Sequence, residues 1–158
     1  IQSYEVIDGA LSFSDHVGKM YMSLEELNHK GKGDFQDIQF DLETETTIEK
    51  VSFKSDGINY LKNARATGDI DLGIDLDKQS YTFKENLMSL NDLSLSFTGV
   101  IKLLNEGFDL DLYFKAPNNK VSSLFSLVPN VYTADYSELT SEGSSTIKGN
   151  VKGIYNSV

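Results

Sequence analysis

The sequence predicts a mainly β fold, a curved antiparallel meander sheet with a short helical insert near residues 119–137. The main observation is alternation. Most of the chain switches between apolar and polar residues at every step, as strands with one apolar and one solvated face do. Short polar turns separate the alternating runs and favour antiparallel neighbours. A single change of period, bracketed by Pro117 and Pro129, predicts the insert.

The first alternating run, residues 1–13, contains the pair Asp8-Gly9. An Asp-Gly pair tolerates the positive φ that a tight hairpin turn requires, so we expect two short strands joined here. Further along, the stretch HKGKGD, His29–Asp34, is expected to form a longer flexible loop.

The next run, residues 40–48, has an apolar face that Thr44 and Thr46 dilute. A second Asp-Gly pair, Asp56-Gly57, predicts a hairpin between the segments VSF and INYL. The polar stretches 77–80 and 105–107 predict two further turns. The apolar members of the run 40–48 are Phe40, Leu42 and Ile48.

The segment DIDLGIDLD places carboxylates at alternate positions, which raises the question of a calcium site. An EF-hand needs a glycine-kinked loop with a glutamate at its twelfth position. Apolar residues separate the aspartates, so a straight strand with a solvated acidic face is the better interpretation. The acidic residues are Asp69, Asp71, Asp75 and Asp77, and the apolar ones are Ile70, Leu72, Ile74 and Leu76.

Two later runs, residues 93–103 and 108–115, have the cleanest alternation in the chain. Their apolar side chains would form one continuous face if the runs pair as a hairpin through the turn at 105–107. These are the candidate lipid-facing residues: Leu93, Leu95, Phe97, Ile101, Leu110, Leu112 and Phe114.

The insert has the spacing of one helical stripe, and its sequence offers start and stop signals. Asn118 and Asn119 are candidate N-caps, and Pro129 would end the helix at or before the preceding residue. We expect this helix to lie as a plug against the apolar face of the sheet, before the strand STIKGNVKGIY. The stripe consists of Val121, Leu124, Phe125 and Val128.

Size and charge limit the class of protein. The chain has 158 residues, a length suited to a single domain 1–158, with no cysteine and a net charge of −10. An acidic surface repels phosphate backbones and anionic headgroups, which argues against nucleic-acid partners. No apolar run approaches the ~20 residues of a membrane-spanning helix. The chain begins abruptly in strand pattern, and we expect it to be a fragment of a longer protein.

No catalytic, cofactor-binding or metal-ligating constellation emerges from the sequence. The two histidines, His16 and His29, lie near glycines and are expected in loops. The sequence has no nucleophile elbow, and HKGKG has neither P-loop nor dinucleotide-binding spacing. What remains is a wide apolar sheet face. That face would close on itself, pack against a second layer, or stay open as a ligand path, and composition alone favours a packed core.

The chain resembles the C-terminal-side periplasmic region of the AsmA family. The resemblance is carried by NDLSLSFTGVIKL and by the block FKAPNNKVSSLFSLVPNVYTADY followed by the glycine-rich strand IKGNVKG. Upstream, YEVIDGALSF, FDLETETT and INYLKNARATGDIDLGIDL are also similar to that region. The resemblance covers nearly the whole chain.

The resemblance implies an envelope protein of Gram-negative bacteria that contributes to outer-membrane biogenesis and lipid transport. It implies a periplasmic location, with the full-length protein anchored in the inner membrane by a helix outside this segment. It also implies a repeating β-groove whose apolar concave face shields phospholipid acyl chains, of which this chain would form a partial β-groove. The expected partners are phospholipid and the remaining segments of the full-length protein.

Two functions therefore follow from the sequence. The first is a non-enzymatic, cofactor-free segment that shields acyl chains on its apolar face. The alternative is a structural or interaction module whose apolar face is only packed core. An open apolar face in the fold favours the first function, and a fully packed face favours the second.

Overall fold

The computed structural model of the protein describes residues 2–125 and 141–155. Within these ranges the chain forms eight strands and one short helix. In chain order the elements are β1 (Ser3–Asp15), β2 (Met20–Gly33), β3 (Gln39–Ser55), β4 (Ile58–Asp75), β5 (Ser80–Leu90), β6 (Leu93–Leu104), β7 (Gly107–Lys120), α1 (Val121–Phe125) and β8 (Ser144–Tyr155).

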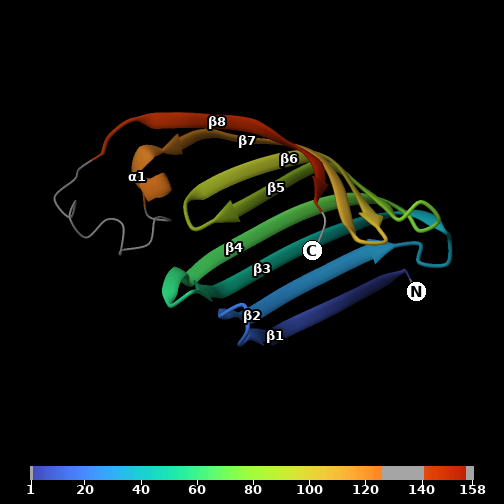
Figure 1. Cartoon of the computed structure of the whole chain (residues 1–158), viewed down its shortest axis with the longest axis horizontal. Coiled ribbons are helices and arrows are strands. Elements are labelled where there is room, and N and C mark those ends of the chain that lie inside the picture. The colour runs from blue at the N-terminus through green and yellow to red at the C-terminus, as the bar shows by residue number, and fades with distance from the viewer. Residues whose placement is uncertain (1, 126–140, 156–158) are drawn as a thin grey trace.

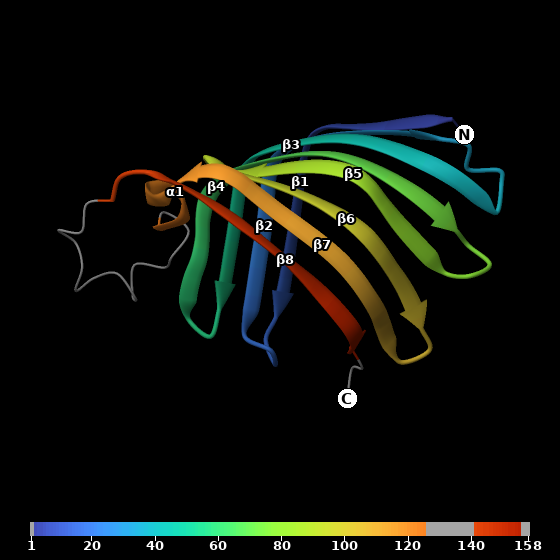
Figure 2. The same ribbon diagram turned by 90° about the horizontal axis from the view of Figure 1, so that it is seen from above.

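The eight strands make one sheet in which spatial order follows chain order from β1 to β8. Every neighbouring pair is antiparallel, which confirms the predicted meander. Figures 1 and 2 show that the sheet is strongly curved rather than flat. Substantial contacts between described elements join only neighbouring strands, and α1 touches β7. The described sheet is therefore a single layer.

The strands are long, from 11 residues in β5 to 18 in β4, whereas about 5–6 is usual. The Asp56-Gly57 hairpin is confirmed between β3 and β4, and its φ values of 47° and 83° suit a type I′ turn. The turns predicted at 77–80 and 105–107 are confirmed between consecutive strands, except that Ser80 and Gly107 are already the first residues of β5 and β7.

The expected hairpin at Asp8-Gly9 is wrong, because β1 runs straight through the pair. The register with β2 shifts between Val6 and Gly9, and Asp8 has a φ of 49°. The positive φ therefore serves a β-bulge rather than a turn. The Asp8 amide donates to Asn28 Oδ1 at 3.1 Å, which satisfies a donor that the bulge displaces from the ladder.

The expected loop over His29–Asp34 is also wrong, because residues 29–33 complete β2. Gly31 is needed there for close packing rather than for flexibility. A Cβ at Gly31 would meet the ring of Tyr4, its partner on β1, so the missing side chain leaves room for that ring.

The helical insert is confirmed only in its first turn, α1, and residues 126–137 of the predicted insert lie outside the described ranges. Asn119 is not its N-cap. Asn119 belongs to β7, and its side chain pairs with Ser94 instead, accepting from the amide at 2.8 Å and donating to the carbonyl at 3.0 Å. The Val121 amide donates to the Gly143 carbonyl at 3.2 Å.

Few apolar side chains are buried in this sheet. Only Val51, Ala64 and Ala116 form the buried apolar set among the described residues, and none of the described large side chains is fully buried. The accessible surface is 11060 Å², against roughly 7,900 Å² for a compact monomer of this mass. The excess surface is the expected consequence of a sheet with no second layer.

Candidate functional site

One side of the sheet carries apolar residues on all eight strands, and we call it the apolar face. It arises because the register of the strands places apolar residues opposite each other on neighbouring strands. Examples are Leu24 opposite Val51 and Leu72 opposite Phe83. Representative members, in strand order, are Leu11, Leu24, Ile48, Leu72, Phe83, Phe97, Leu112 and Val151.

The predicted lipid-facing residues lie together on this face, in β6 and β7. Ile101 is the register partner of Leu110, and Phe97 is the partner of Phe114. All seven predicted residues are half-buried, because side chains of neighbouring strands in the same sheet cover part of each one. The Phe97 ring lies 5.1 Å from that of Phe83 on β5, so the face continues past β6. Contact with lipid remains a prediction for Leu93, Leu95, Phe97, Ile101, Leu110, Leu112 and Phe114.

The predicted plug is only partly described. Val121 and Leu124 are half-buried in α1, beside β7. Val128 and the side chain of Phe125 lie outside the described part of the structure. That this stripe covers the apolar face therefore stays a prediction.

A polar chain interrupts the apolar face near its β1 edge. His29 is not in a loop but in β2, where its Nε2 lies 2.9 Å from Tyr4 Oη and its Nδ1 lies 2.8 Å from Thr46 Oγ1. Both ring nitrogens therefore have hydroxyl partners within the sheet. The strand period could have placed His29 on this face, had residues 29–33 been recognised as strand.

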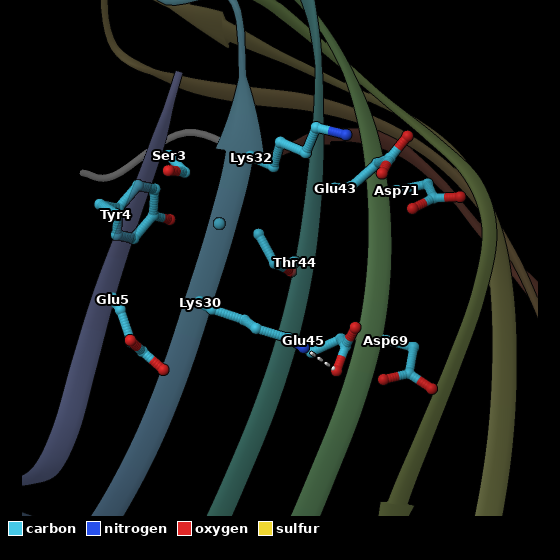
Figure 3. Close-up of a pocket in the computed structure, with 11 residues that line it drawn as sticks. Ser3, Tyr4, Glu5, Lys30, Lys32, Glu43, Thr44, Glu45, Asp69 and Asp71 are labelled. Atoms are coloured by element: carbon cyan, nitrogen blue, oxygen red, sulfur yellow. Dashed lines mark ion pairs between the residues drawn. The ribbon is translucent and has the colours of Figure 1, made fainter. Parts of the chain in front are cut away.

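The opposite side, the polar face, carries charged side chains and a hollow of about 780 Å³. Figure 3 shows its lining on β1 to β4, with the ion pair of Lys30 and Glu45 at 2.8 Å. Hydrogen bonding to Glu45 and the charge of that carboxylate raise the pKa of Lys30. Exposed pairs of this kind contribute little stability.

The aspartates of β4 lie on the polar face, as their alternation predicts. Asp69 and Asp71 line the hollow, whereas Asp75 accepts from Lys78 Nζ at 2.8 Å and from Gln39 Nε2 at 2.9 Å. In residues 2–125 and 141–155, no group of three or more histidine or carboxylate side chains is arranged to hold a metal ion.

Comparisons of the chain with protein-family models, with curated proteins and with solved structures found no match. Across the described segments, none of the helices has the length and apolar character needed to cross a membrane.

Proposed function

We propose that this chain is a non-enzymatic, AsmA-like segment that shields phospholipid acyl chains on its apolar face. In this proposal the face is the concave inner wall of a partial β-groove, in a periplasmic protein that contributes to outer-membrane biogenesis. The remaining segments of a longer, inner-membrane-anchored protein would continue the groove.

The observation that supports the proposal is the lack of cover over the apolar face in the described structure. A sheet that packed against a second layer would bury its large apolar side chains, yet no described one is fully buried. Exposed apolar patches beyond a few hundred Å² are rare in soluble monomers and mark interaction sites.

The dimensions of the face also suit lipid chains. At a spacing of about 4.8 Å, eight strands span about 34 Å, and the shortest strand is about 36 Å long. One leaflet of a bilayer core is about 15 Å thick. An acyl chain therefore fits within the face in either direction.

The test places one charge on each side of the same strand. Phe97→Asp puts a carboxylate on the apolar face, and Thr98→Asp puts one on the exposed polar face as the control. Each purified variant is incubated with phosphatidylcholine that carries a photoreactive acyl chain, and the crosslinked fraction and the melting temperature are measured. We expect Phe97→Asp to fold and to lose most of its crosslinking, because its carboxylate would have to be desolvated against hydrocarbon.

Two results would contradict the proposal. If Phe97→Asp, Leu95→Asp and Ile101→Asp all unfold while Thr98→Asp does not, the face is packed core, as the structural-module alternative requires. If these variants fold and crosslink as strongly as the parent, this face does not hold the lipid.

A further inference from the structure

The sheet ends in two long strands that each have a neighbour on one side only. β1 and β8 form opposite edges of the sheet, as Figure 1 shows, and within the described ranges they pair only with β2 and β7. Neither strand contains proline, the residue that most simply blocks edge pairing. Each edge therefore presents backbone donors and acceptors to a further strand.

The hydrogen bonds between β1 and β2 show which backbone groups of β1 point toward the open edge. Gly33 N donates to Gln2 O at 3.0 Å, so Gln2 faces β2 with its backbone groups. Because hydrogen-bonding direction alternates along an antiparallel strand, the backbone groups of Ser3 and Glu5 point away from β2, toward the open edge.

The two edges match each other in direction and in face. In a meander of eight strands β1 and β8 run in opposite directions, so β8 of one copy placed beside β1 of another forms an antiparallel pair. A shift of one residue would move the apolar side chains of one strand to the polar face, so a continuous apolar face excludes every second register. Of the registers that remain, we take the one in which the two strands overlap along their full length. Val6 then lies opposite Val151 of the other copy. Beyond the extra residue of the bulge in β1, Leu11 lies opposite Ile147.

The same register matches charges on the polar face. Glu5 of one copy comes to lie opposite Lys152 of the other. Within one chain Lys152 already pairs with Asp111, and Lys30, the register partner of Glu5, pairs with Glu45. Across the junction, neighbouring strands would therefore carry alternating acidic and basic side chains on the polar face, in the order Asp111, Lys152, Glu5, Lys30 and Glu45. Directly opposed unlike charges favour this register over its neighbours.

We propose that β1 and β8 are complementary association edges, and that copies of this chain join head to tail by pairing β8 with β1. The contact is heterologous, because each junction leaves a free β1 at one end and a free β8 at the other. Growth therefore continues beyond a dimer and extends one apolar face. This inference concerns the two edges of the 158-residue chain and does not depend on what the apolar face binds. In a longer protein, flanking strands that continued the groove would compete with other copies for these edges.

Sedimentation velocity of the full 158-residue chain over a wide range of concentration tests the association. We expect a series of species that grows with concentration, and Lys152→Glu to weaken it about tenfold because like charges then face each other. Lys148→Glu is the matched control. It makes the same charge change on the same edge, but it faces the neutral Ala10 in the proposed register. A mixture of Glu5→Lys and Lys152→Glu should associate more strongly than Lys152→Glu alone.

Disulfide trapping tests the register, and the chain has no cysteine of its own. Val6→Cys protein mixed with Val151→Cys protein should form a mixed disulfide dimer, because opposed residues lie within bonding range. Ile147→Cys is the control, since it has a similar exposure but lies about 13 Å further along the strand. A chain that stays monomeric at every concentration overturns the proposal. Association with equal trapping at both positions also overturns it, and would indicate stacking of apolar faces instead.

Discussion

Gly99 in β6 lies where a side chain would strike the neighbouring strand. Its φ is +136°, and a Cβ built there would be 2.1 Å from the carbonyl oxygen of Asp111 and 2.8 Å from Cα of Leu112. That oxygen and that carbon belong to the backbone of β7, so they can move away only if the ladder shifts. The glycine therefore allows β6 and β7 to approach each other closely.

We predict that Gly99→Ala lowers the free energy of unfolding by about 3 kcal/mol, from backbone strain and from this collision. Gly153→Ala is the control. Its φ is +148°, but a Cβ placed there would have no described neighbour within 4 Å, so it bears the strain without the collision. Urea denaturation of both variants measures the difference. Equal losses would show that the approach to Asp111 is not a constraint.

Asp75 shows how a turn adjusts the acidity of one carboxyl group. Its hydrogen bond from the Lys78 side chain, followed by that from the Lys78 amide, lowers the pKa of Asp75 below its usual value. A lowered folded-state pKa means that the stabilisation is present at neutral pH and is lost as the pH falls through that lowered value.

We predict that Lys78→Met raises the pKa of Asp75 toward about 3.9, the value of an unperturbed aspartate. The rise should be incomplete, because the Lys78 amide still donates to Asp75 Oδ1 at 2.9 Å. NMR titration of the Asp75 carboxyl carbon measures it. An unchanged midpoint would mean that the side-chain bond is not formed in solution.

At the scale of the element, the irregularities of β5 depend on one buried amide. The register of β5 shifts against both β4 and β6 near Asn86, a residue that is 3 % exposed. Its Oδ1 accepts from the Asp71 amide at 2.6 Å, and its Nδ2 donates to the Phe97 carbonyl at 3.4 Å. The amide thus links three strands where the backbone ladder is interrupted.

We predict that Asn86→Leu lowers the free energy of unfolding by about 2–4 kcal/mol, because two backbone groups lose their partners. Asn59→Leu on the exposed end of β4 should cost far less. Chemical denaturation compares the two variants. If Asn86→Leu is as mild as Asn59→Leu, solvent must replace both bonds.

Sequence patterns predict the elements of this sheet better than their irregularities. Alternation identified the strands because it reports directly on which side of a sheet each residue lies. The Asp8-Gly9 bulge was predicted as a hairpin because both structures need the same positive φ. Asn86 and Asn119 were not recognised as strand links, since their partners lie on other strands and only the register brings them together.

The candidate site was predictable to a similar degree. The seven lipid-facing candidates share one face, as their spacing required, but whether that face is covered depends on packing that no local pattern encodes. The Tyr4, His29 and Thr46 chain was missed because HKGKGD was interpreted as a loop.

At the scale of the whole molecule, the single-layer sheet predicts an expanded particle. A compact chain of this length has a radius of gyration of about 15 Å. Small-angle scattering from the monomeric fraction should give a clearly larger value, because strands of up to 18 residues lie in one extended layer. A value near 15 Å would mean that the sheet closes on itself in solution.

The sequential order of the strands also has a kinetic consequence. Since each strand pairs with the strand just before it in the chain, no described pairing requires a distant segment to be found first. The entropy of loop closure is then limited to one hairpin at a time, and topologies with local contacts fold fast. Folding of the sheet can nucleate at any hairpin and propagate in either direction, much as folding of a repeat array propagates from a local nucleus. A chain that enters its folding compartment gradually, from its N-terminus, can therefore begin to order before its last strands have arrived.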